Sequence, residues 1–193
     1  MKQRLFIILL LSISHLVAQD KDSIIKHQFN AALEAQLNHK FVELADIQHP
    51  ITLRFFRQRM GIEYEKLRKT YSAATLSKVI GINGNPKTSP LSDKDVFVNI
   101  CNKAAELEPS FAGDKKYLPI FVHGIIHSER GDAFIIYEYA VREEAEESTI
   151  RFRQPGVSVF IKHNDEWLMK SSALSKTLPI VWKRELYRMN KKN

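Results

Sequence analysis

The most constraining feature of the sequence is a long stretch rich in β-branched and aromatic residues, at positions 117–172. Such residues suit a pleated, half-buried surface, and turn-forming residues such as Asn164-Asp165 divide the stretch. Four or five strands are therefore predicted, over residues 117–128, 133–141, 149–154, 157–163 and 166–172. A charged loop is expected at residues 142–148, and a bulge or turn at Pro155.

Helical periodicity precedes this stretch. Apolar residues at steps of three and four predict helices over residues 22–37, 41–47, 52–74 and 92–107, with a short strand at 77–82 and a candidate terminal helix at 178–189. Gly61 is a candidate break in the third helix, and Ser92 with Asp95 has the spacing of a capping box. Helices followed by an antiparallel sheet predict an α+β fold, in which the N-terminal helices pack on a strongly curved C-terminal sheet.

The first residues have the composition of a secretory signal peptide. Lys2 and Arg4 precede an apolar run that ends near a small residue, Ala18. The run is too short for a membrane span, which needs ~20 apolar residues, and no cysteine follows it as a lipid-anchor site. We therefore expect export to the periplasm or the extracellular space after removal of residues 1–18. The sequence then predicts one domain over residues 19–176 and a basic extension over residues 177–193.

The chain contains one cysteine, Cys101, which excludes an internal disulfide bond. Helical spacing places Cys101 beside Phe97 and Ile100 on the predicted apolar face. We interpret it as a buried small hydrophobic residue, with a nucleophile or an intermolecular bridge as the alternatives.

The formal net charge is +7, and removal of Lys2 and Arg4 lowers it by two. Much of the excess lies at residues 54–69 and 183–192. No aromatic-basic ladder or recognition motif accompanies it, so nucleic acid is not an expected partner. A solubilising surface is the simplest interpretation, and attraction to anionic lipid or polysaccharide surfaces is the alternative.

Three stretches resemble NTF2-like (SnoaL-like) domains, which have a cone-shaped α+β fold. They are FNAALEAQLNHKFVELADIQHP, FVHGIIHSERGDAFIIYEYAV and FIKHNDEWLMKSS, at residues 29–50, 121–141 and 160–172. The segment at 52–92 is longer than the minimal form of that superfamily, and the tail beyond residue 175 is extra. The superfamily includes isomerases, dehydratases and hydrolases as well as non-catalytic binding and dimerisation modules, so the resemblance implies a pocket but no single function.

In such a fold the sheet curls around a pocket, and side-chain alternation along two strands selects its candidate lining. The lining residues are Phe121, His123, Ile125, Phe134, Ile136 and Glu138. Glu138 and His123 are the candidate acid or base, because apolar neighbours raise the pKa of a carboxyl group. The alternatives are that Glu138 faces water or pairs with Arg151 or Arg153, and that Tyr137 and Tyr139 lie on the inward face.

Neither a metal nor a cofactor is expected. His123 and His127 are four residues apart in a predicted strand, which separates them by ~13 Å. The sequence predicts a non-catalytic domain that binds a small apolar ligand or a protein partner, in the pocket or on the open sheet face. An isomerase, dehydratase or hydrolase that uses Glu138 or His123 is the alternative, and a homodimer formed through the open sheet face is the third candidate.

Overall fold

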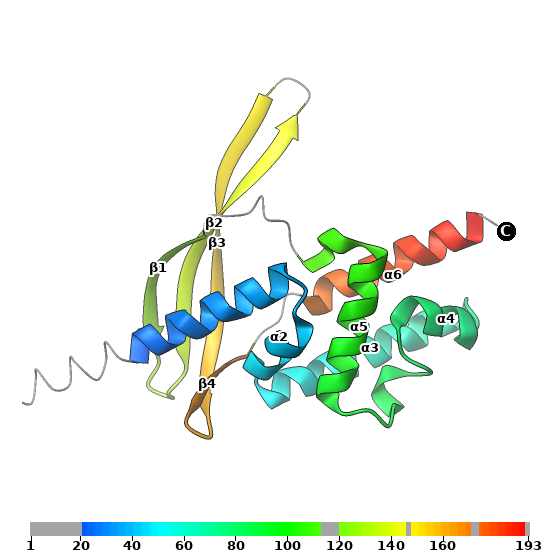
Figure 1. Cartoon of the computed structure of the whole chain (residues 1–193), viewed down its shortest axis with the longest axis horizontal. Helices are drawn as coiled ribbons and strands as arrows, with labels where there is room; N and C mark the ends of the chain where they lie inside the picture. The colour runs from blue at the N-terminus through cyan, green and yellow to red at the C-terminus, as the bar shows by residue number, and fades with distance from the viewer. Residues whose placement is uncertain (1–20, 113–119, 146–147, 171–173, 192–193) are drawn as a thin grey trace, which may run out of the picture.

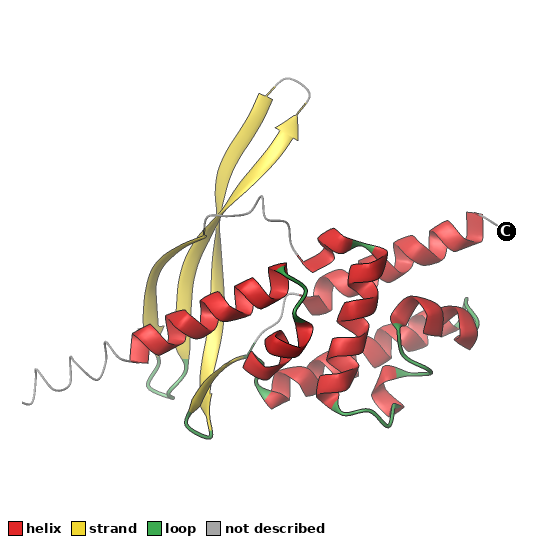
Figure 2. Cartoon of the chain, viewed as in Figure 1, coloured by secondary structure: helices red, strands yellow, loops and turns green. Residues whose placement is uncertain are grey.

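The computed structural model describes residues 21–112, 120–145, 148–170 and 174–191. After a helix over residues 21–37, the elements are α2 (Phe41–Ile47), α3 (Pro50–Arg68), α4 (Ala73–Ile80), η1 (Pro86–Thr88), α5 (Asp93–Leu107), η2 (Pro109–Ala112), β1 (Ile120–His127), β2 (Ala133–Ala145), β3 (Ser148–His163), β4 (Glu166–Met169) and α6 (Leu174–Lys191). The predicted α+β class is confirmed (Figure 2). The predicted signal peptide lies outside the described residues.

The four strands form an antiparallel sheet in the order β1-β2-β3-β4. The two end strands are not neighbours, so the sheet is open. It lies to one side of the molecule, and the far ends of β2 and β3 project beyond the rest of the chain (Figure 1). The expected loop at 142–148 is wrong, because β2 continues to Ala145 and β3 begins at Ser148.

The expected interruption at Pro155 is also wrong, since β3 runs through this position as one strand. β4 pairs with β3 over Phe160–His163, so Pro155 lies on the stretch of β3 beyond that pairing. An edge position tolerates a residue without a backbone N–H group. The next residue, Gly156, lies against the ring of Tyr137, where a Cβ atom would collide.

The helix over residues 21–37 lies across one face of the sheet (Figure 1). Its buried side chains include Ile25 and Phe29, and the ring centroid of Phe29 is 4.9 Å from that of Tyr137 on β2. Near the start of this helix, Asp22 Oδ1 is 2.7 Å from Nε2 of His127 on β1. These contacts make the helix the cover that one face of the sheet requires.

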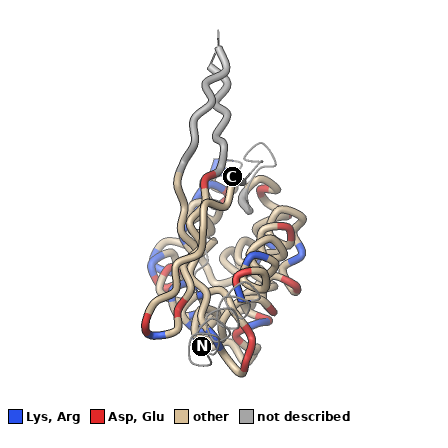
Figure 3. Tube along the Cα trace, turned by 90° about the vertical axis from the view of Figure 1, so that its left-hand side faces the viewer, with Lys and Arg blue, Asp and Glu red and all other residues tan. Residues whose placement is uncertain are grey.

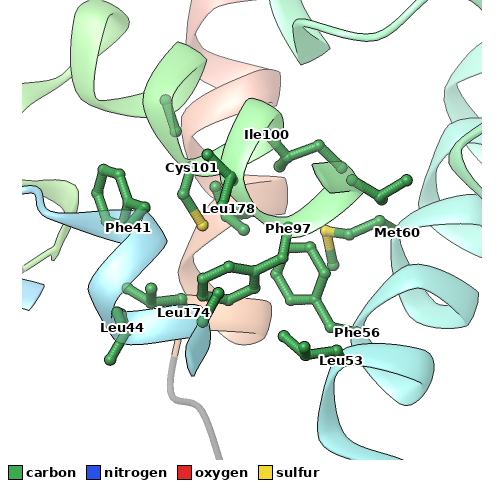
Figure 4. Close-up of a cluster of buried hydrophobic side chains, with 14 of the residues drawn as sticks. Phe41, Leu44, Leu53, Phe56, Met60, Phe97, Ile100, Cys101, Leu174 and Leu178 are labelled. Atoms are coloured by element: carbon green, nitrogen blue, oxygen red, sulfur yellow. The ribbon is translucent and has the colours of Figure 1, made fainter. Parts of the chain in front are cut away.

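The helices α2 to α6 pack mainly against one another and form a second part of the same hydrophobic core. Figure 4 shows the side chains of α2, α3, α5 and α6 converging on Phe97 of α5, whose ring centroid is 4.8 Å from that of Phe56. Cys101 is fully buried in this cluster, as predicted. α6 is longer than the expected terminal helix and belongs to the core, because Leu178, Trp182 and Leu186 are buried.

Two helical segments differ from the prediction. α3 continues through Gly61, where η1 passes so close that a Cβ atom would lie 2.8 Å from Oδ1 of Asn85. This glycine therefore allows a close approach and does not break the helix. The strand expected at 77–82 is wrong: α4 begins after Ser72, whose Oγ accepts a hydrogen bond from Thr75 N at 3.1 Å, and it ends at Gly81 with a φ of 81°.

Candidate functional site

A β-bulge in β1 decides which of the predicted site residues share a face of the sheet. The register of β1 against β2 shifts at His123, so that Phe121 lies opposite Glu138 and Ile125 lies opposite Ile135. Residues directly opposite in an antiparallel pair share a face, and an extra residue in one strand exchanges the faces beyond it. The expectation that Phe121 and Ile125 share a face is therefore wrong.

The two faces of the sheet differ in exposure. The inner face, covered by the helix at 21–37, carries Val122, Ile125, His127, Ala133, Ile135, Tyr137 and Phe160. The opposite side, which we call the outer face, carries Phe121, Ile126, Phe134, Ile136, Glu138, Val157 and Val159. Ile135 is fully buried, whereas Ile126 is 56% and Val157 is 57% exposed. The predicted pocket lining is thus divided, with Ile125 on the inner face and Phe121, Phe134, Ile136 and Glu138 on the outer face.

The structure brings the two candidate catalytic residues together. His123 Nε2 is 3.3 Å from Oε2 of Glu138, and their side chains are 49% and 29% exposed. The carboxylate can orient the imidazole and pairs with it when the ring is protonated. Solvent screens such a pair, so its contribution to stability is small. The pair lies on the outer face of an open sheet and not inside an enclosing cone.

The alternative partners of Glu138 lie further along the projecting ribbon. The register places Arg151 opposite Arg142, Arg153 opposite Ala140, and Pro155 opposite Glu138. The side chains of Arg151 and Arg153 are outside the described part of the chain. His123 is a charged partner of Glu138 among the described side chains, and the expected pairing with Arg151 or Arg153 falls on side chains outside them.

The second histidine of β1 has a structural position. His127 donates a hydrogen bond from Nε2 to the carboxylate of Asp22 and lies edge-on to Trp167, with ring centroids 6.2 Å apart. It faces the covering helix, and His123 belongs to the bulge. Within residues 21–112, 120–145, 148–170 and 174–191, no three His, Cys, Asp or Glu residues gather closely enough to hold a metal ion.

A histidine pair joins the helices to the end of the sheet. His49 precedes α3, and its Nδ1 accepts a hydrogen bond from Ile51 N at 3.1 Å. Its ring centroid is 4.7 Å from that of His163 at the end of β3. Burial, followed by the nearby charges of His163 and Lys170, lowers the pKa of His49 below its ordinary value. His49 is thus the N-cap of α3.

An open depression of about 510 Å³ lies between α4 and α5, away from the predicted site. Polar residues line it: Ser77, Lys78, Gly81, Asn83, Asn99, Asn102, Lys103 and Glu106. Lys103 Nζ and Glu106 Oε2 are 2.6 Å apart, so the charges in the depression partly neutralise each other. Sequence reasoning missed this feature, because its lining comes from two helices and a loop that show no shared motif.

No protein-family model, curated protein or solved structure compared with the chain matches it. The helices in the described part of the chain include none with the length and apolar composition needed to cross a bilayer. Among the surfaces that the structure describes, the outer face of the sheet collects most of the predicted site residues and is the candidate functional site.

Proposed function

We propose that the chain is an exported, non-catalytic binding module whose outer face binds an apolar protein surface, with a second copy of the chain as the partner. One observation carries this proposal: large apolar side chains on the outer face are exposed, with Phe121 at 43%, Ile126 at 56% and Val157 at 57%. Contiguous exposed apolar residues of this kind are typical of interaction surfaces.

The charge distribution supports an apolar partner. Over residues 120–128, 133–138 and 155–163 the sheet carries few charged residues, whereas the turns and the helices carry many (Figure 3). On the outer face, Glu138 lies near the middle of β2 and is paired with His123. Sheet faces that pack on other sheets are mainly apolar in this way.

The resemblance to NTF2-like domains also supports the proposal. It is carried by residues 29–50, 121–141 and 160–172. That superfamily includes binding and dimerisation modules among its members. We therefore propose membership of this superfamily together with the binding role.

Sedimentation velocity of the full chain over a wide range of concentrations tests the proposal. We expect a dimer that dissociates on dilution, and a monomer at the same concentrations for the double variant Ile126→Ser, Val157→Ser. The matched control is Val42→Ser, at a 53% exposed valine on α2. A chain that stays monomeric throughout, or a double variant that dimerises like the control, would contradict the proposal.

Catalysis by His123 and Glu138 is the second candidate, favoured by the 3.3 Å contact between their side chains. Its test is a panel of ester, dehydratable and enolisable small molecules incubated with the chain and with Glu138→Gln. Loss of a general acid or base lowers turnover by about 10²–10⁴-fold, so a decrease of that size would support catalysis. A binding module without catalysis predicts no turnover in either protein.

Export is tested by fractionating cells that produce the full chain. We expect the protein outside the cytoplasm, with an N-terminus that begins after Ala18. Uncleaved protein confined to the cytoplasm would refute the signal-peptide prediction.

A further inference from the structure

The solvent sides of α3 and α6 carry two stripes of exposed residues that are either apolar or basic. The stripe of α3 and the residue after it consists of Ile51, Phe55, Arg59, Ile62, Lys66 and Lys69, and that of α6 consists of Lys176, Ile180, Lys183, Tyr187 and Lys191. Steps of three and four residues place each set on one side of its helix. We call the two stripes together the basic face.

The two helices that carry the stripes are neighbours in space although they are far apart in the sequence. α3 and α6 pack against each other, and both pack against α5. Phe56 of α3 and Leu178 of α6 point into the cluster around Phe97 of α5 (Figure 4). The stripes lie on the opposite sides of their helices from these buried residues. Both stripes therefore point away from α5 and into solvent.

The apolar members of the basic face are large and well exposed. Phe55 is 59%, Ile62 is 56%, Ile180 is 51% and Tyr187 is 60% exposed. Leaving such side chains in water forgoes the free energy that their burial would contribute. Their spacing along both helices indicates a surface that is covered in the working state of the protein.

The charge of the basic face is almost entirely positive. The two basic segments seen in the sequence, at 54–69 and 183–192, belong largely to α3 and α6. Lys66 is offset by Glu63, whose carboxylate lies 2.7 Å from its ammonium group. The remaining cations of the two stripes are Arg59, Lys69, Lys176, Lys183 and Lys191, and Lys191 also lies 4.9 Å from the ring of Tyr187.

We propose that the basic face docks on the surface of an anionic phospholipid bilayer. Helices that combine Lys and Arg with aromatic and aliphatic residues on one side lie in the membrane interface, where the apolar groups enter the acyl boundary and the cations meet the headgroups. Each Lys or Arg near an anionic bilayer contributes about 1 kcal/mol. Nucleic acid would satisfy the cations but would leave Ile62 and Ile180 in water, so charge and apolar exposure together favour the bilayer.

Co-sedimentation of the full chain with vesicles provides the first measurement. We expect binding to vesicles of phosphatidylcholine with phosphatidylglycerol to exceed binding to phosphatidylcholine alone, and to weaken as salt is added. The double variant Lys176→Gln, Lys183→Gln should bind the anionic vesicles about 25-fold more weakly, at roughly 1 kcal/mol for each charge. The control Lys26→Gln, Lys162→Gln removes two exposed lysines outside the basic face and should bind like the wild type. All of these proteins share residues 1–20, so a difference between them belongs to the substituted surface.

A position-specific measurement separates docking by the basic face from any other attachment. A fluorophore is attached to Phe55→Cys or, as the control, to Ile126→Cys on the outer face, each in a Cys101→Ala background. Brominated phosphatidylglycerol vesicles should quench the fluorophore at position 55 and leave that at position 126 unchanged. Equal quenching at both positions, or none at 55, would overturn the proposal. The fluorophore at position 55 is also exposed to a soluble quencher in the presence of a duplex oligonucleotide or of the vesicles. Protection by the oligonucleotide and not by the vesicles would overturn the proposal in favour of nucleic acid.

Discussion

The guanidinium of Arg57 holds the loop between α4 and α5 against α3. Its Nε donates to Pro86 O at 3.0 Å, Nη1 donates to Leu91 O at 2.9 Å and to Asp93 Oδ1 at 3.0 Å, and Nη2 donates to Ser89 O. The side chain is 18% exposed. A planar fork with five donors can satisfy several carbonyl groups at once, which an ammonium group on a flexible chain cannot.

Arg57→Lys should therefore lower the free energy of unfolding by about 2 kcal/mol, because carbonyl groups of the loop lose their donors. Urea denaturation measures the change. The matched control is Arg54→Lys, since Arg54 is 69% exposed and its Nε lies 4.0 Å from Asp93 Oδ2. We expect that control to change stability by less than about 0.5 kcal/mol. Equal effects of the two substitutions would contradict the role assigned to Arg57.

His49 makes the stability of the chain depend on pH. The folded state lowers the pKa of His49 below its ordinary value of 6.5, through burial and through His163 and Lys170. As the pH falls through 6.5, the unfolded chain takes up the proton first. The contribution of His49 to the free energy of unfolding is therefore complete above the ordinary pKa, and it is lost as the pH falls below that value.

We expect His49→Asn to reduce the loss of stability between neutral and mildly acidic pH. Asparagine is a good helix N-cap that can accept the hydrogen bond from Ile51 N, and it does not titrate. Chemical denaturation of both proteins across this pH range measures the difference. The same pH dependence in variant and wild type would show that His49 is not the responsible group.

Several local features were predictable because a short stretch of sequence determines them. The cap at Ser92 is confirmed, with its Oγ accepting from Asp95 N at 3.0 Å, and so is the burial of Cys101. The bulge at His123 was not predictable, because strand register depends on the partner strand and not on the local sequence. This one residue moved Phe121 to the other face from Ile125 and divided the predicted pocket.

At the scale of elements, tertiary contacts explain where the prediction fails. Residues 142–145 continue β2 despite their charge, because β3 supplies a paired strand along their whole length. The short run at 77–82 has residues typical of a strand, but most of it belongs to the helix α4. The cap at Ser72 begins this helix, and Gly81, in close contact with α5, ends it. The sequence predicted a basic extension over residues 177–193, and the side of α6 that carries Leu178, Trp182 and Leu186 is buried in the core.

Gly81 and Gly84 form a matched pair for testing the close contact of Gly81 with α5. Both have a φ of 81°, but only at Gly81 would an added Cβ atom meet neighbours, 2.6 Å from Lys103 Cβ and 3.0 Å from Asn99 O. Gly84→Ala should cost about 1 kcal/mol of stability for its left-handed backbone. Gly81→Ala should cost about 3 kcal/mol, because steric overlap adds to the backbone term. Thermal and urea unfolding measure the loss of stability in each variant. Equal losses would contradict the packing of α4 on α5.

Two aromatic residues of α6 test whether this helix is part of the core. Trp182 is fully buried and Tyr187 is 60% exposed. Trp182→Ala should lower the free energy of unfolding by about 3–5 kcal/mol, whereas Tyr187→Ala should change it by less than about 0.5 kcal/mol. Denaturant titrations measure both. A small effect at Trp182 would contradict the assignment of α6 to the core.

At the scale of the whole molecule, the α+β class followed from periodicity. Which helix covers the sheet, and which helices pack against one another, did not follow from it. Apolar spacing predicts that a helix has a buried side but not which element covers it. Here the helix at 21–37 covers the sheet, and α2 to α6 bury their apolar sides mainly among themselves. This arrangement leaves one face of the sheet open and two basic helices exposed, and both proposals depend on it.

The most direct test of this account is the reactivity of cysteines placed at two consecutive positions of β3, Val157 and Ser158. Val157 lies on the outer face and is 57% exposed, whereas Ser158 lies opposite the buried Ile135 and is 7% exposed. In a Cys101→Ala background and in dilute monomeric protein, Val157→Cys should react with a thiol reagent at once under native conditions. Ser158→Cys should react only when the chain unfolds. Protection at 157 with rapid reaction at 158 would show that the faces are reversed and would contradict the account.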